Sequence, residues 1–186
     1  TDPVSGISWG RWVGGALTVT DRISNTTSTL ANSNSSHWIA GPVMTGPVSL
    51  PVSGTYNYTW AGGTAPTDSL GNVGTLNSAS LTANFTAQTV NIGVDVTTAG
   101  VGNLVASGMN IPIEQKSFFG AATANSLNGG TNVGSLTVTC TGGCGGAVVS
   151  GNVGGVFTGP GGIGAGMVYG FQKGTVFVNG VTAFHR

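Results

Sequence analysis

The clearest pattern along the chain is an alternation of apolar and polar side chains with a period of two. In residues 53–60 the aromatic residues Tyr56, Tyr58 and Trp60 alternate with serine, threonine and asparagine. Residues 90–96 and 165–171 repeat the alternation with valine, isoleucine, methionine and aromatic side chains on one face. Successive side chains of a β-strand point to opposite faces, so each segment is predicted to be a strand with one buried face.

Eight such strands are predicted from residue 53 onward, separated by Asn-Gly, Gly-Gly and Gly-Pro segments that favour turns. They cover residues 53–60, 74–86, 90–96, 102–110, 133–140, 147–157, 165–171 and 175–184. Strands joined by short turns form an antiparallel meander, and closing it removes both exposed edges. The sequence therefore predicts an all-β fold with an eight-stranded antiparallel barrel over 52–186. Two stacked sheets would use the same alternation, and residues 111–119 are expected to make one short turn.

Residues 1–51 form a separate strand-and-loop leader in this interpretation. Residues 7–13 and 16–20 are predicted to pair as a hairpin around Gly14 and Gly15. The Ser/Thr/Asn-rich run 24–36 is expected to be a surface loop, and the apolar pattern resumes at 37–39. The leader packs on its own barrel or joins another subunit.

Composition limits the function more than it identifies it. The 186 residues include 34 glycines and are 39% apolar, which is enough for one folded core. Five acidic and five basic side chains give a formal net charge of zero. Nucleic acids and anionic membranes attract basic surfaces, so no nucleic-acid partner is predicted.

Ionisable residues are too few and too scattered to suggest catalysis. His37, Asp68 and one of the many serines could be combined into a triad, but in a chain with so many serines such a combination arises easily by chance. His185 lies next to the last residue and is expected to belong to a frayed end. No catalytic, cofactor-binding or metal-binding residue is predicted, and we expect that the protein is not an enzyme.

The tryptophans and one arginine are the candidate contact surface. Trp9, Arg11, Trp12, Trp38 and Trp60 lie in the leader and in the first barrel strand. Indole rings supply large contact areas at low entropic cost, as protein and carbohydrate interfaces require. Core packing or plugging of a barrel end is the alternative role for these rings.

Cys140 and Cys144 are the two cysteines of the chain and flank a short glycine-containing loop. This spacing can bring their Cα atoms within disulfide reach, and it is not a zinc or redox spacing. A disulfide predicts an oxidising compartment; two free thiols in a loop are the alternative.

No run of about 18 apolar residues is long enough for a membrane helix. The start at Thr1 shows no charged region followed by an apolar one, so we expect a mature or excised fragment. Membrane proximity would then depend on an anchor outside this chain.

Two resemblances to bacterial families rest on short motifs. GGVFTGP (154–160), GAG (164–166), YGF (169–171) and GVTAF (180–184) resemble the closing strands of barrels in transferrin-binding-protein-B-like surface lipoproteins. WGRW (9–12), HW (37–38), GTY (54–56), GTAPT (63–67) and GNVG (71–74) resemble the C-terminal region of some FecR-domain proteins. These resemblances imply an envelope or surface β-barrel of a Gram-negative bacterium that binds an unspecified ligand.

Three functions follow as hypotheses. The first is a non-enzymatic extracellular or cell-envelope β-barrel domain that mediates binding at the bacterial surface, to a protein partner or to itself through the leader. The second is a structural subunit of an extracellular filament or surface assembly, linked through its N-terminal strand to a neighbouring sheet edge. The third, an integral outer-membrane barrel, is less favoured because matched aromatic girdles are absent from the sequence.

Overall fold

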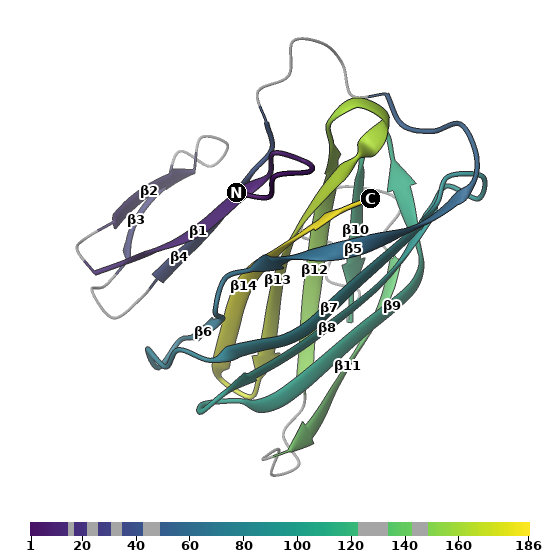
Figure 1. Ribbon diagram of the computed structural model, residues 1–186. Coiled ribbons are helices and arrows are strands. Elements are labelled where there is room, and N and C mark those ends of the chain that lie inside the picture. Colours follow the sequence, from purple (N-terminus) through teal and green to yellow (C-terminus); the bar gives the residue numbers. More distant parts are fainter. Residues whose placement is uncertain (15–16, 22–25, 31–34, 43–48, 123–133, 143–148) are drawn as a thin grey trace.

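A computed structural model describes residues 1–14, 17–21, 26–30, 35–42, 49–122, 134–142 and 149–186 (Figure 1). Within these residues the chain is all-β, and its one helical element is the short 3-10 turn η1 (Pro160–Gly162). No helix in the described part is long and apolar enough to cross a membrane.

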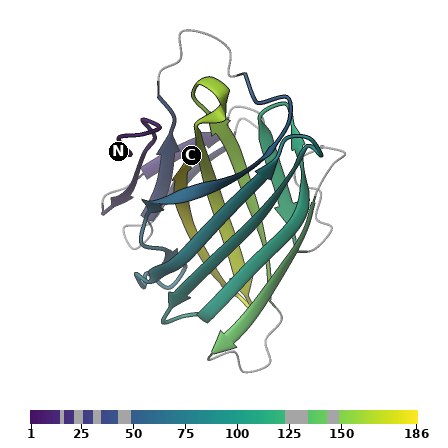
Figure 2. The ribbon, with the colours of Figure 1, turned by 45° about the vertical axis from the view of Figure 1, so that its right-hand side comes forward.

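Nine strands form the wall of a closed barrel (Figures 1 and 2). They are β5 (Thr55–Gly63), β7 (Thr75–Asn84), β8 (Thr89–Thr98), β9 (Gly102–Glu114), β10 (Ser117–Ala121), β11 (Gly134–Gly142), β12 (Val149–Thr158), β13 (Gly164–Lys173) and β14 (Val176–His185). The barrel closes because β5 pairs with β7 through residues 55–58 and with β14 through residues 59–63. The two-residue strand β6 (Thr67–Asp68) pairs with Val178 and Asn179 of β14, nearer the start of that strand than the residues that pair with β5.

The structure confirms the predicted all-β barrel, but the predicted number of eight strands and the purely antiparallel pairing were wrong. The additional strand, β10, begins inside the segment expected to turn. β10 and β11 both run antiparallel to the long strand β9, and they meet as a short parallel pair at Gly120 and Gly134. The side chain of Ile111 occupies this junction, where a Cβ at either glycine would lie 2.7 Å from it. The five-residue β10 and the nine-residue β11 thus both pair with the single strand β9.

The barrel interior is filled with apolar side chains. Residues 90, 92, 94 and 96 of β8 are all buried, as their alternation predicted. The ring of Phe157 lies between those of Tyr58, Phe85 and Phe118, at centroid distances of 5.8, 5.3 and 5.7 Å. Burying one such side chain stabilises the fold by about 1.5–3 kcal/mol. The interior is therefore a packed core.

Glycines in the strands make room for these rings. Phe118 lies directly over Gly155, so a Cβ at that position would collide with the ring. The neighbouring Gly154 points to the outer face, where the nearest side-chain atom would be 3.6 Å from a Cβ. Two adjacent glycines thus differ sharply in the space around them.

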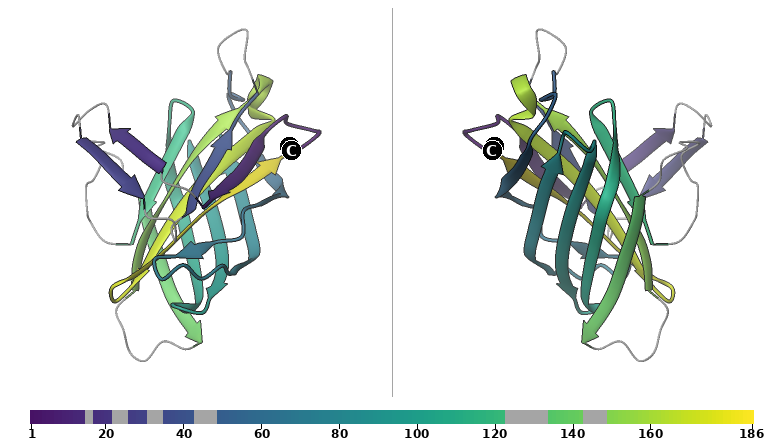
Figure 3. Two further views of the ribbon diagram at one scale, coloured as in Figure 1. Left: turned by 90° about the vertical axis from the view of Figure 1, so that its left-hand side faces the viewer. Right: turned by 90° about the vertical axis from the view of Figure 1, so that its right-hand side faces the viewer.

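The N-terminal strands pair differently from the predicted hairpin. β1 (Ser8–Val13) pairs with β4 (Ser35–Ala40), while β2 (Leu17–Asp21) pairs with β3 (Thr26–Leu30) (Figures 1 and 3). The run 24–36 therefore contains a strand and the start of another, not only a loop. Alternation predicts strands but not their partners, and here aromatic residues of β1 and β4 meet across the pair.

Candidate functional site

We call the pair β1–β4 the ribbon; one of its faces packs on the outer wall of the barrel. The ring of Trp9 lies over Gly62 of β5, and the side chain of Ile39 lies over Gly166 of β13. A Cβ would come within 2.8 Å of the side chain above it at either glycine, and Gly62 also has a φ of +138°. Glycine is needed at both positions for the ribbon to lie this close.

Hydrogen bonds fix the same face of the ribbon. His37 contacts Thr64 Oγ1 through Nδ1 and Thr67 Oγ1 through Nε2, each at 2.7 Å. The hydroxyl of Ser35 lies 2.5 Å from the same Thr67 oxygen. Burial, and secondarily the charge of Arg11, lower the pKa of His37 from 6.5 to about 4. His37 is therefore neutral at physiological pH and bonds the ribbon to the barrel.

The opposite face of the ribbon presents two tryptophans to solvent. Trp12 and Trp38 come from neighbouring positions of β1 and β4, with ring centroids 6.1 Å apart and planes inclined by 32°. Trp38 covers Gly10, and 58% of Trp12 is exposed. Because Trp12 and Trp38 share one face of the ribbon, they form a continuous aromatic surface, which we call the tryptophan face.

The other predicted contact residues lie elsewhere. Trp9 faces the barrel, and Arg11 alternates with Trp12 and so shares the face of Trp9. Trp60 is 38% exposed in a recess of about 380 Å³ between β5 and β7, where the two strands separate beyond Tyr58. Of the five residues predicted as one contact surface, the structure brings Trp12 and Trp38 together on an accessible face.

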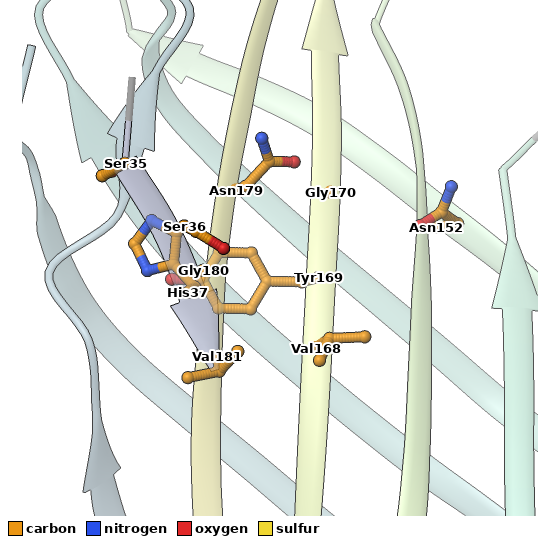
Figure 4. A pocket seen from close by; sticks show the side chains of 10 residues that line it. All are labelled: Ser35, Ser36, His37, Asn152, Val168, Tyr169, Gly170, Asn179, Gly180 and Val181. Carbon is orange, nitrogen blue, oxygen red and sulfur yellow. The ribbon is translucent and has the colours of Figure 1, made fainter. Parts of the chain in front are cut away.

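A groove of about 390 Å³ lies between β4 and the outer face of β12, β13 and β14 (Figure 4). Ser35, Ser36 and His37 form its wall on β4. Asn152 and Asn179 lie opposite Gly170 on the two neighbouring strands. Sequence reasoning missed this groove, because four separate strands supply its uncharged residues and no motif links them.

The acidic residue of the triad hypothesis, Asp68, serves the fold. Asp68 is buried and accepts hydrogen bonds from the backbone of Leu70, Asn72 and Gly100 and from the hydroxyl of Thr98. Although burial acts to raise it, the pKa of Asp68 is lowered overall by these bonds, led by those from Asn72. Asp68 thus stabilises the turns at this end of the barrel, and it has no bond to His37 in the described residues.

His185 was predicted to lie in a frayed end, and this was wrong. It is the last residue of β14, and its Nδ1 lies 2.9 Å from Oδ1 of the buried Asp2. Burial opposes the charged form of Asp2, but hydrogen bonds from Ser5 and the contact with His185 lower its pKa overall. These contacts hold residue 2 against the end of the last strand.

The cysteine prediction stays open. Cys140 lies in β11, whereas Cys144 lies outside the described residues. Mass measurement before and after reduction checks the predicted disulfide. Among the residues that the structure describes, no three His, Cys, Asp or Glu side chains form a group suited to a metal.

Comparisons with known proteins give distant structural similarity alone. No family model matches the chain, and no curated protein matches it by sequence; the FecR-domain resemblance has no support. A mutant of the vaccine antigen Transferrin Binding Protein B from Haemophilus parasuis aligns over 93% of this chain, with a TM-score of 0.41 and 15% identity. Isotype 1 Transferrin binding protein B from serogroup B Neisseria meningitidis aligns over 98%, with a TM-score of 0.40 and 14% identity. This chain spans 38% and 32% of those two chains.

Proposed function

We propose that this protein is a non-enzymatic binding domain that holds a protein partner through the tryptophan face of its ribbon. The observation that carries the proposal is the pair formed by the exposed Trp12 and the half-buried Trp38 on a ribbon that is packed against the barrel. Aromatic side chains held in place lose little entropy on binding and dominate the energies of many interfaces.

The use of the ionisable residues supports a binding role over catalysis. His37, Asp68 and Asp2 each make hydrogen bonds that join separate segments of the fold. A general acid or base has to present its titrating atom to a substrate. In these three residues the titrating atoms are already bonded to the protein.

We place the domain outside the cytoplasm, in the periplasm or at the surface of a Gram-negative bacterium. The predicted disulfide between Cys140 and Cys144 supports an oxidising compartment. The outer face supports contact with water, since Ser135, Thr137 and Thr139 of β11 are exposed while Leu136 and Val138 are buried. Barrels that span a membrane show the reverse pattern, so we do not propose an integral outer-membrane barrel.

Comparative capture of partners tests the proposal. Wild type, a Trp12→Ala/Trp38→Ala double variant and a Trp60→Ala control are immobilised and exposed to proteins of the medium in which the source organism lives. We expect one protein to bind wild type and control but not the double variant. Calorimetry with that purified protein should then show at least about a tenfold loss of affinity in the double variant. Equal binding by all three forms would refute the tryptophan face as the contact surface.

A structural subunit is the second candidate, and the unpaired edge of β1 favours it. In the described residues β1 pairs with β4 on one side alone, so its other edge is open to a neighbouring strand. Sedimentation of the purified protein decides between the two, since a subunit should associate with rising concentration and the binding domain should remain monomeric.

A further inference from the structure

We propose that the groove beside β4 binds an extended, uncharged peptide segment, which adds to β4 as a third strand of the ribbon. The proposal rests on the proposed function in that the peptide belongs to a protein partner, and it names a second contact surface, separate from the tryptophan face.

The first observation is the free edge of β4. β4 pairs with β1 through all six of its residues, and its backbone makes no hydrogen bond to any other described residue. In an antiparallel pair every second residue turns its N–H and C=O away from the partner strand. The edge of β4 that borders the groove therefore offers alternating donors and acceptors, as strand addition requires. No proline, lysine or bulge protects it.

The second observation is how the barrel already receives the ribbon. β1 places Trp9 on Gly62, and β4 places Ile39 on Gly166. Both strands dock by laying a side chain on a glycine of the outer face. A further strand beside β4 would meet Gly170 of β13, which lines the groove, and would then reach Gly154 of β12, whose cross-strand partner Val168 also lines it.

The surroundings of these two glycines differ, and they define the chemistry of the peptide. The amide oxygens of Asn179 and Asn152 lie 3.2 and 3.6 Å from the Cβ position of Gly170. Neither amide has a hydrogen-bond partner in the described part of the chain. The Cβ position of Gly154 is flanked by Phe119 at 3.6 Å and by Val168 at 3.8 Å. One position thus suits a polar side chain and the other an apolar one.

The spacing of the two positions matches an extended chain. Gly154 pairs with Val168, two residues from Gly170, so the glycines are diagonal neighbours about 7–8 Å apart. Residues i and i+2 of a strand are about 6.8 Å apart on one face. β4 crosses the outer face of the barrel obliquely: its residues 35–37 lie beside β14, and its Ile39 lies over Gly166 of β13. The line from Gly170 of β13 to Gly154 of β12 slants across the strands in the same direction.

Charge sets the remaining requirement. The titratable residues that line the groove are His37, which is neutral, and Tyr169, whose pKa is raised by burial. A charged peptide side chain would lose water without gaining an opposite charge. The matching segment is therefore uncharged, with an apolar residue and a serine, threonine, asparagine or glutamine two positions apart.

A phage-displayed library of uncharged hexapeptides, selected on the intact protein and then synthesised, provides the probe. We expect peptides with the apolar–x–polar spacing, in either direction, and a rise in Kd of at least about tenfold in Gly170→Val and Gly154→Val. The control is Gly142→Val on β11, where no atom lies within 4 Å of the Cβ position. Circular dichroism confirms that all three variants fold.

Backbone methylation of the peptide tests strand addition without altering the protein. N-methylation should raise Kd at least about tenfold at alternate residues and should have little effect at the residues between them. Failure to select a peptide that depends on Gly170 and Gly154 would overturn the proposal, as would an even response to methylation. Binding of N-acetylglucosamine instead, with NMR shifts confined to Asn152 and Asn179, would also overturn it. The capture experiment with Trp12 and Trp38 is independent, so either proposal can fail while the other stands.

Discussion

Protonation of His37 should weaken the attachment of the ribbon to the barrel, and the effect can be isolated by pH. Both ring nitrogens of neutral His37 contact threonine hydroxyls, one as a donor and one as an acceptor. A protonated ring has two donors and no acceptor, so the ring could no longer accept the hydrogen bond that one threonine hydroxyl now donates to it. The cation would also lie close to Arg11, whose charge already opposes it.

The sign and size follow from the two pKa values. His37 has a pKa of about 4 in the folded protein and an ordinary value of 6.5. Between these values the unfolded chain binds more protons, so the free energy of unfolding falls as pH falls from 6.5 to 4. The limiting slope is about 1.4 kcal/mol per pH unit. We expect a total loss of about 1–3 kcal/mol, because partial exposure of the ring to water screens the charge.

Urea denaturation followed by tryptophan fluorescence, repeated from pH 4 to pH 7, measures this loss. His37→Gln should remove most of the pH dependence in that window, and the wild-type protein should retain it. Asp2 and Asp68 affect stability at lower pH than His37 does. Because their pKa values are lowered in the folded protein, the stability that their carboxylates contribute is lost as pH falls below the ordinary value of 3.8. An NMR titration placing the pKa of His37 near 6.5 would refute the reasoning, as would an unchanged slope in His37→Gln.

The remaining predictions use the same denaturation assay. Tyr169→Phe should leave the free energy of unfolding unchanged or raise it by up to about 1 kcal/mol, because the hydroxyl is buried without a partner in the described residues. Tyr58→Phe should lower it by about 1–2 kcal/mol, because its hydroxyl donates to a buried carbonyl; equal losses in the two variants would contradict this account. Gly155→Ala should lower it by about 1–3 kcal/mol through collision with the ring above it, and the control Gly154→Ala by less than about 0.5 kcal/mol. Asp68→Ala should lower it by about 2–4 kcal/mol, since several donors lose their acceptor; a loss below about 0.5 kcal/mol would show that water replaces the carboxylate.

Local alternation was sufficient to predict most barrel strands. In β8 the residues Val90, Ile92, Val94 and Val96 are buried as predicted. A strand with one buried and one solvent-exposed face alternates apolar and polar residues, so the sequence itself shows which side chains point inward. The same reasoning missed β10, because five residues beside a longer strand carry too short a pattern to separate a strand from a turn.

Pairing over long sequence distances could not be predicted. β1 is a strand in the expected place, but its partner β4 begins inside the run that was expected to be a loop. The pairing is set by contacts such as Trp38 over Gly10. The bond between His185 and Asp2 joins residues 183 positions apart and has no local signal. Of the candidate site, the sequence identified the tryptophans but not which of them share a face, because that depends on the register of a pair it did not predict.

The positions of the glycines within the strands explain part of their abundance. From the sequence, Asn-Gly, Gly-Gly and Gly-Pro pairs mark the turns between the predicted strands. Several glycines instead lie within strands and face a large side chain: Gly155 lies under Phe118 inside the barrel, while Gly62 and Gly166 receive the ribbon outside it. A glycine inside a strand weakens that strand, so its use on both faces indicates that close packing of rings and ribbon offsets the cost. The outer-face glycines that receive no side chain from the described residues are therefore the positions where a partner can approach the barrel most closely.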